Sequence, residues 1–233
     1  LGPLIGRFGK ARVAMPGGCK IGARKIDMHL SVLEALGVSF VNDHGYLYAS
    51  TPDGLHAAKV FLDFPSVGAT ENMLMASVTA EGTTVIDNAA REPEIVDLAN
   101  MLNEMGASVQ GAGSSTIIVH GVSLDDMHPC EHWVVGDRIE AGTYLTAGAL
   151  LGGPVTVEGI DPDFLRTVMM KFEEMGVEVS FTEDSITVWR TKPLRATDIQ
   201  TLPHPGFPTD LQAQFSLLAA FADGCSVVSE NIF

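Results

Sequence analysis

A ten-residue loop, Met15–Arg24, combines one cysteine with paired glycines and basic residues. Paired glycines allow backbone conformations that are closed to other residues, so a loop of this kind can fold over a ligand. The positive charges of Lys20, Arg24 and Lys25 favour the thiolate form of a neighbouring cysteine. Cys19 is therefore a candidate acid or nucleophile, although a free cysteine taken alone is more often a passive small residue.

The charge of the chain is distributed unevenly. The net charge is −15, but the first 26 residues contain six basic side chains and no acidic one. In an acidic protein, a segment without carboxylates is best explained by an anionic ligand that the overall field would otherwise repel. These basic residues are Arg7, Lys10, Arg12, Lys20, Arg24 and Lys25.

Length and composition bound the class of protein. With 233 residues, 46% of them hydrophobic, the chain can form one large domain or two smaller ones. A pI near 4.7 argues against nucleic acid and against an anionic membrane surface as partners. Three distant cysteines give neither a disulfide framework nor a metal-ligand spacing, and the seven histidines show no ligand spacing either. We expect a cytoplasmic protein with no metal, no cofactor and no signal peptide.

An internal repeat of about 70 residues runs through the chain. Three similar segments, 33–40, 102–109 and 172–179, contain Gly37, Gly106 and Gly176, which are 69 and 70 residues apart. A second series contains Gly82, Gly153 and Gly224, each 71 residues from the next. A fixed period is typical of an architecture built from repeated supersecondary units.

The pattern within one repeat predicts helix, strand, helix, strand and strand. The apolar stretch 66–81 predicts a buried helix that Gly82 caps, and residues 83–86 predict a strand. A second helix is expected from Pro93 to Gly106, followed by a hairpin over 107–120. In the next repeat, Asp161 and Pro162 are expected to open the second helix.

The array begins and ends within a unit. The pattern places the start of the chain just before the second helix of a first unit, and the end after the first strand of a last unit. A unit of this size buries its apolar faces only against neighbours, so we expect a fragment of a larger protein. The polar stretch 122–134 is the expected boundary between part of one domain (1–134, two repeats) and part of a second (135–233, one and a half repeats).

Several strings of residues, spread over the whole chain, are typical of one known family. They are Leu1–Leu4, Arg7–Gly9, Pro16–Cys19, Ile21–Arg24, Pro65–Asn72, Asn88–Asp97, Asp137–Thr143 and Pro203–Asp210. On these strings the chain resembles the enolpyruvyl transferase family. The resemblance implies an α/β (α+β) class, with two domains built as inside-out barrels of βαβαββ units. That fold agrees with the repeat.

The resemblance also implies a reaction, the transfer of the enolpyruvyl group of phosphoenolpyruvate to the 3-hydroxyl of UDP-N-acetylglucosamine in peptidoglycan synthesis. Cys19 matches the general acid, which is also the residue that fosfomycin alkylates, and Asp210 matches the base. Arg24 matches an arginine that grips phosphoenolpyruvate. The remaining matches are the segment lining the uridine (Arg24, Lys25, Ile26, Asp27 and Met28), the diphosphate-binding helix start (Ser66, Val67 and Gly68) and a nucleotide-sugar contact (Ile232).

Two alternatives stay open. One is the sister reaction on shikimate 3-phosphate, a branch that lacks the cysteine-containing loop. The other is a nucleotide-sugar-binding fragment or paralogue without turnover. Because the family's N-terminal Lys-Asn pair and several of its arginines have no match here, we expect these 233 residues alone to turn over poorly or not at all.

Overall fold

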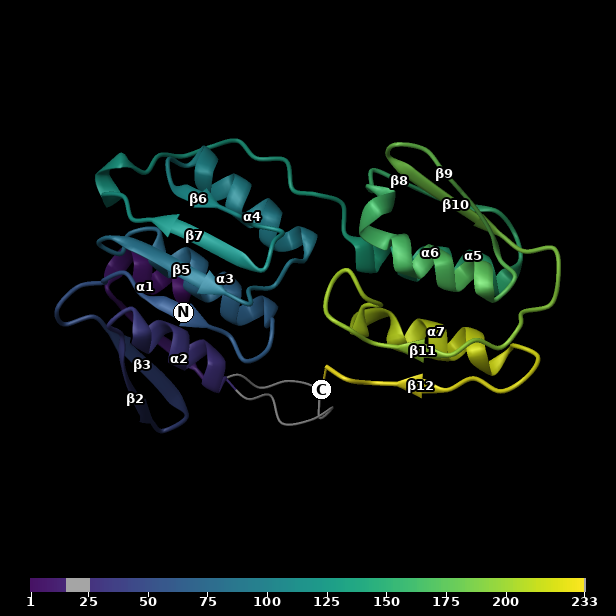
Figure 1. The fold of residues 1–233 in the computed structure, drawn as a ribbon, viewed down its shortest axis with the longest axis horizontal. Helices are drawn as coiled ribbons and strands as arrows, with labels where there is room; N and C mark the ends of the chain where they lie inside the picture. Colours follow the sequence, from purple (N-terminus) through teal and green to yellow (C-terminus); the bar gives the residue numbers. More distant parts are fainter. Residues whose placement is uncertain (16–25, 233) are drawn as a thin grey trace. The chain divides into compact units, whose positions relative to one another are not determined.

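The computed structural model describes residues 1–15 and 26–232, and these form two compact units (Figure 1). Unit 1 is Leu1–Trp133 and unit 2 is Val134–Phe233. Each unit is described by itself. The assignment of 1–134 and 135–233 to two domains of the whole protein stays a prediction.

The described part of unit 1 contains four α-helices, seven strands and one 3₁₀ turn. They are α1 (Gly2–Phe8), β1 (Lys10–Ala14), α2 (Asp27–Ala35), β2 (Ser39–Asp43), β3 (Tyr46–Ser50), β4 (Lys59–Phe61), α3 (Val67–Ser77), β5 (Thr83–Asp87), α4 (Pro93–Glu104), β6 (Ser108–Gln110), β7 (Thr116–His120) and η1 (Leu124–Asp126).

The described part of unit 2 contains three α-helices, five strands and two 3₁₀ turns. They are α5 (Arg138–Leu151), β8 (Val155–Glu158), η2 (Pro162–Leu165), α6 (Arg166–Glu174), β9 (Glu178–Phe181), β10 (Ser185–Trp189), β11 (Ile199–Gln200), η3 (Thr209–Leu211), α7 (Gln212–Ala220) and β12 (Val228–Ser229).

Three sheets share one strand order, as expected of a repeat. The orders are β1-β3-β2, β5-β7-β6 and β8-β10-β9, with the last strand of each set in the middle and both pairings antiparallel. In unit 1, β4 joins the edge of β5 in parallel, and α3 connects these two strands. In unit 2, β11 and β12 form the same parallel pair around α7. The predicted order of helix, strand, helix, strand and strand is confirmed.

The repeated glycines end the second helix of each set. Gly37, Gly106 and Gly176 follow α2, α4 and α6 with φ values of 94°, 100° and 85°, a region that favours glycine. The second series is less regular, because Gly152 rather than Gly153 has the positive φ and caps α5.

Three predicted boundaries are wrong. The helix expected over 66–81 ends at Ser77, because Val78 and Glu81 pair outside it: Val122 N donates to Val78 O, and Glu81 N donates to Leu55 O. Gly82 lies in the turn before β5 and does not cap the helix. Pro162 opens a 3₁₀ turn, with Asp161 accepting from Asp163 N, and α6 begins only at Arg166.

The chain also enters its first repeat earlier than predicted. A helix, α1, and a strand, β1, precede α2. Gly2 and Gly6 argue against a helix by propensity, yet α1 packs closely on α3. A Cβ on Gly2 would lie 2.5 Å from Asn72 O, and one on Gly6 would lie 2.8 Å from Met75 O. The close packing of α1 on α3 therefore requires glycine at positions 2 and 6. The same glycines lower the helix propensity of this segment, so propensity alone does not predict α1.

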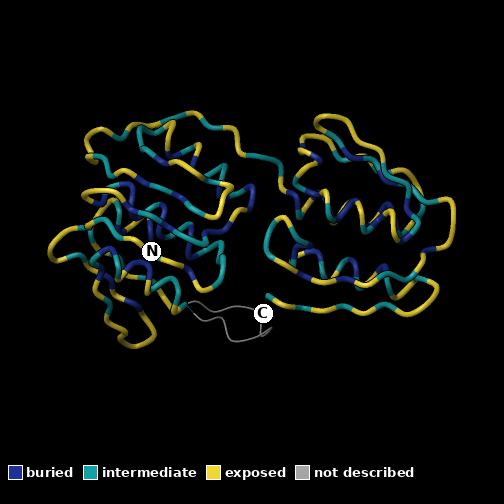
Figure 2. Tube along the Cα trace, viewed as in Figure 1, coloured by how far each residue is buried: buried dark blue, intermediate teal, exposed yellow. Residues whose placement is uncertain are grey.

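Each unit has its own hydrophobic core, and buried stretches recur along α3 and α5 (Figure 2). In unit 1, α3 contacts α1, α2 and α4, and buries Met73 and Leu74 completely. In unit 2, Phe215 is fully buried, with its ring centroid 4.7 Å from that of Phe172 and 4.9 Å from that of Phe207. Because α3 packs against three other helices of unit 1, the position of its N-terminus is fixed.

Candidate functional site

The start of α3 contains three of the predicted binding residues. Ser66 is the N-cap, and its Oγ accepts from Ala69 N at 3.3 Å. Its carbonyl oxygen accepts from Thr70 N at 3.0 Å and from Thr70 Oγ1 at 2.8 Å. Val67 and Gly68 form the first turn, where backbone N–H groups and the positive end of the helix dipole favour an anion. The predicted helix start is confirmed, and its ligand stays a prediction.

The start of α2 contains three more of the predicted residues. Ile26 is the N-cap, Asp27 is the first helical residue, and Met28 N donates to Asp27 Oδ1 at 3.1 Å. These residues lie in the same unit as Ser66. The helix that they begin, α2, packs against α3, the helix that Ser66 caps. The other predicted residues of this segment, Arg24 and Lys25, lie outside the described residues, as does Cys19.

One amide side chain, that of Asn72, joins these helices, and it was not among the predicted residues. Asn72 Oδ1 accepts from Gly2 N at 2.7 Å, and Asn72 Nδ2 donates to Gly68 O at 2.9 Å and to His29 Nδ1 at 3.1 Å. Burial lowers the pKa of His29. Asn72 falls within one of the resemblance strings and His29 directly follows the predicted uridine segment, but neither position is marked by a local pattern.

Carboxylates gather around Glu71 of α3. The pKa of Glu71 is raised by burial first, and then by the charges of Glu94 and Glu92. Glu92, which precedes α4, is itself buried, and its Oε2 accepts from Arg91 N at 2.9 Å. Unit 1 therefore carries a cluster of acidic groups between the starts of α3 and α4.

The predicted residues of unit 2, Asp210 and Ile232, are linked through one glutamate, Glu230. Asp210 is exposed within η3, just before α7, and no side-chain cap is found at this turn. Its neighbour Thr209 donates from Oγ1 to Glu230 Oε2 at 2.8 Å, and Ile232 N donates to Glu230 Oε1 at 2.7 Å. Thr201 Oγ1 also donates to Glu230 Oε1, at 2.8 Å. Glu230 thus brings Asp210 and Ile232 to the same end of the β11–β12 pair.

The polar stretch before unit 2 is attached to α4 through a histidine. His132 donates from Nε2 to Asp97 Oδ1 at 3.0 Å and from Nδ1 to Glu104 Oε2 at 2.9 Å. Both ring nitrogens act as donors only in the imidazolium form. These hydrogen bonds, that to Asp97 foremost, raise the pKa of His132.

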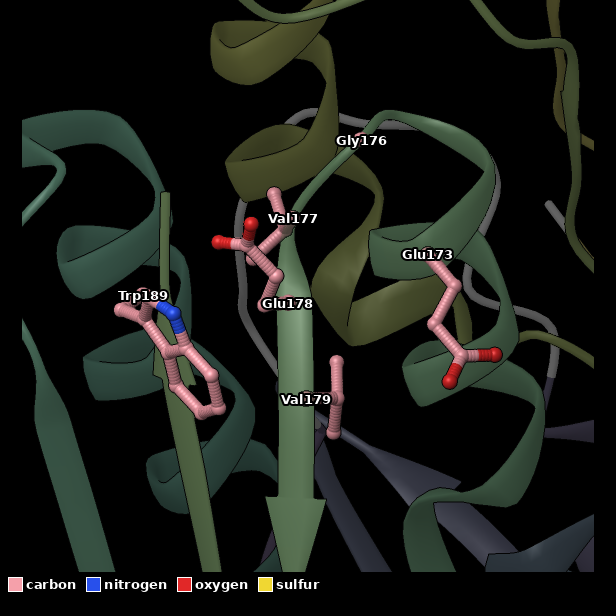
Figure 3. Close-up of a pocket in the computed structure, with 6 residues that line it drawn as sticks. All are labelled: Glu173, Gly176, Val177, Glu178, Val179 and Trp189. Carbon is pink, nitrogen blue, oxygen red and sulfur yellow. The ribbon is translucent and has the colours of Figure 1, made fainter. Parts of the chain in front are cut away.

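A hollow of about 490 Å³ lies on unit 2, where α6 ends and β9 pairs with β10 (Figure 3). Trp189 and Glu178 are opposite each other on these two strands, and Glu173 lies on α6, across β9 from Trp189 in this view. None of the described predicted site residues lines this hollow. Its carboxylates would repel the anionic ligands that the basic N-terminal segment predicts.

Within the described residues, no group of three or more potential ligand side chains could hold a metal ion. No described helix has the length and apolar character needed to cross a membrane.

The sequence profile of the EPSP synthase (3-phosphoshikimate 1-carboxyvinyltransferase) family matches residues 1–233. The chain belongs to this family. Among curated proteins, the chain is 52% identical over 233 residues to UDP-N-acetylglucosamine 1-carboxyvinyltransferase 2 of Staphylococcus saprophyticus, and it covers 55% of the length of that relative. It is 53% identical over the same length to UDP-N-acetylglucosamine 1-carboxyvinyltransferase 1 of Symbiobacterium thermophilum, and covers 52% of it. The chain therefore spans about half the length of the curated relatives it matches, and the predicted resemblance to enolpyruvyl transferases is confirmed.

Two solved structures support the fold. The enolpyruvyl transferase NikO from Streptomyces tendae matches with a TM-score of 0.82 and 25% identity, over 97% of this chain and 54% of that one. The EPSP synthase from Acinetobacter baumannii matches with a TM-score of 0.61 and 21% identity, over 93% and 51%, which is a likeness of fold alone. The α/β (α+β) fold class predicted for this chain is confirmed.

Proposed function

We propose that this chain is part of an enzyme that transfers the enolpyruvyl group of phosphoenolpyruvate to the 3-hydroxyl of UDP-N-acetylglucosamine, the first committed step of peptidoglycan synthesis. The observation that carries the proposal is identity of 52% and 53%, over all 233 residues, to two curated relatives named for that activity. The capped start of α3 beside the start of α2 supports it, because it offers a site for the diphosphate of a nucleotide sugar.

The proposed chemistry needs an acid and a base. Cys19 gives its proton to carbon 3 of phosphoenolpyruvate, which makes carbon 2 electrophilic. The sugar 3-oxygen then forms a bond to carbon 2, and its proton passes to Asp210, whose exposed position leaves its carboxylate accessible. The Cys19 thiolate then takes one proton back from carbon 3 as phosphate leaves carbon 2, which restores both the double bond and the thiol. Arg24 holds the carboxylate or phosphate of phosphoenolpyruvate in this scheme.

The remaining predicted residues bind the acceptor. We assign Lys25, Ile26, Asp27 and Met28 to the uridine, and Ser66, Val67 and Gly68 to the diphosphate. Ile232 contacts the nucleotide sugar. The proposed partners are these two small molecules, and the proposal includes neither nucleic acid nor a membrane surface.

The test uses the full-length protein that contains these residues. Phosphate release with both substrates should be abolished by Cys19→Ala, whereas calorimetric binding of UDP-N-acetylglucosamine should survive. Cys225→Ala is the matched control, since Cys225 is an exposed free cysteine of unit 2. Fosfomycin should alkylate Cys19 and leave Cys130 and Cys225 unmodified. Equal activity of wild type and Cys19→Ala would refute the assigned acid.

Other outcomes identify the alternatives. Binding of UDP-N-acetylglucosamine without any phosphate release from the wild-type protein indicates a nucleotide-sugar-binding protein. Phosphate release with shikimate 3-phosphate as the acceptor indicates the sister reaction.

We propose a cytoplasmic location for this activity. The described cysteines, Cys130 and Cys225, are both free thiols, as is typical of a reducing compartment. A fluorescent fusion that labels the cell envelope instead of the cell interior would contradict this location.

A further inference from the structure

The orientation of the Asn72 amide is fixed by its three partners. Gly2 N–H can only donate, so it requires the amide oxygen, and Gly68 O can only accept, so it requires the amide nitrogen. If the amide were flipped, its N–H would face the N–H of Gly2, and its oxygen would face the carbonyl oxygen of Gly68. The group that Asn72 presents to His29 is therefore N–H, and His29 Nδ1, 3.1 Å away, must accept.

An accepting Nδ1 defines the state of the His29 ring. A histidine whose Nδ1 accepts is neutral and carries its single proton on Nε2. Burial of His29 favours the same neutral form. The negative charge of Asp27 acts to raise the pKa of His29, but the lowering effect of burial is larger. The ring consequently has a donor at Nε2 and no free lone pair at Nδ1.

The donor edge of the ring lies against the first turn of α3. A Cβ placed on Gly68 would be 2.7 Å from His29 Cε1 and 3.3 Å from His29 Nε2. Any side chain at this position would push the ring away, so glycine is required for the contact. The imidazole Nε2–H therefore lies next to the backbone that Ser66 caps, within unit 1 and on described residues alone.

We infer that Asn72 is a positioning residue that holds His29 as a neutral Nε2–H donor at the start of α3, where His29 binds the diphosphate of the nucleotide sugar. The ligand part of this inference rests on the proposed function. The arrangement adds a side-chain donor to the backbone donors of the helix. It also excludes the tautomer that would place a lone pair against the anion.

The first experiment measures the His29 ring itself. Long-range ¹H–¹⁵N correlation spectra of the histidine-labelled protein, with His29 assigned through His29→Gln, distinguish the two neutral tautomers and the imidazolium. We expect the Nε2–H tautomer at pH 7. In Asn72→Asp a carboxylate replaces the donor, so His29 should become imidazolium. A wild-type ring protonated at Nδ1, or no change in Asn72→Asp, overturns the inference.

The second experiment measures the affinity for UDP-N-acetylglucosamine by calorimetry. His29→Ala and Asn72→Ala should each weaken binding by about tenfold, the scale of one lost hydrogen bond. If Asn72 acts through His29, then Asn72→Ala should have little further effect in the His29→Ala background. A full additional loss in that background means that Asn72 has only a structural role.

A matched control separates fold damage from this effect. Asn103 makes a similar pair of amide bonds on α4, donating to Val109 O at 2.9 Å and accepting from Val109 N at 2.7 Å. Asn103→Ala should leave both the His29 spectrum and the affinity unchanged. If the wild-type protein does not bind UDP-N-acetylglucosamine, the proposed function and the ligand role of His29 both fail, while the spectrum still decides whether Asn72 sets the tautomer.

Discussion

Replacement of Phe215 by alanine should destabilise unit 2 by about 4–5 kcal/mol. Phenylalanine-to-alanine changes in cores cost about 3–5 kcal/mol, and the cost is larger where neighbours cannot collapse into the cavity. Phe215 is 0% exposed, and its ring contacts are fully buried Phe172 and nearly buried Phe207. One contact is tilted at 38° and the other is edge-on at 78°, so two favourable aromatic pairs are lost with the ring. The loss is a large fraction of the roughly 5–15 kcal/mol that stabilises a domain.

Urea unfolding followed by tryptophan fluorescence can measure this loss, because the two tryptophans differ in exposure. Trp189 is partly buried in β10 of unit 2, whereas Trp133 is 95% exposed and gives a solvent-like signal in both states. Phe221→Ala is the matched control, since Phe221 is 66% exposed just after α7 and should change stability by only about 0.5 kcal/mol. A loss below about 1.5 kcal/mol for Phe215→Ala, or an equal loss for the control, would show that this aromatic cluster is not the core of unit 2.

Three further perturbations test other contacts. Gly2→Ala places a Cβ 2.5 Å from the carbonyl oxygen of Asn72, so thermal unfolding should show a loss of about 1–3 kcal/mol, while Gly153→Ala, in open space, should show almost none. The raised pKa of His132 implies stabilisation that is complete below the unfolded pKa of about 6.5 and lost as pH rises through the folded pKa. The difference in urea midpoint between wild type and His132→Gln should therefore close at alkaline pH, and a difference independent of pH would contradict the imidazolium. Asp137 accepts from two backbone N–H groups at the start of α5, so Asp137→Ala should cost about 1 kcal/mol in urea unfolding and Asp137→Asn much less; equal losses would exclude capping.

The fold was predictable where a local pattern coincided with tertiary structure. The stripe of apolar residues after Pro93 predicts α4, and the β-branched run 116–120 predicts β7. Prediction failed where a distant partner decides the structure. α1 contains Gly2 and Gly6, which are needed because the backbone of α3 lies so close. α3 ends early because Val78 O and Glu81 N pair with other segments.

The same distinction applies to the candidate site, where a local feature was predictable and a contact between distant residues was not. A serine before an apolar helix predicts the cap at Ser66, and the structure has it. The contact between His29 and Asn72 joins residues 43 positions apart, so neither periodicity nor spacing could reveal it. The roles of Cys19 and Arg24, which lie outside the described residues, rest on the resemblance and on their chemistry.

The two parallel strand pairs have a consequence for folding. The hairpins β2–β3, β6–β7 and β9–β10 join neighbours in sequence, and such elements form within microseconds. The pairs β4–β5 and β11–β12 form only after α3 and α7 have been brought across, which carries a larger loop-closure entropy. Refolding should therefore pass through species whose hairpins are complete while β5 and β12 still expose an unpaired edge. Those edges are available to other chains in the meantime, so the yield of refolding should fall as protein concentration rises.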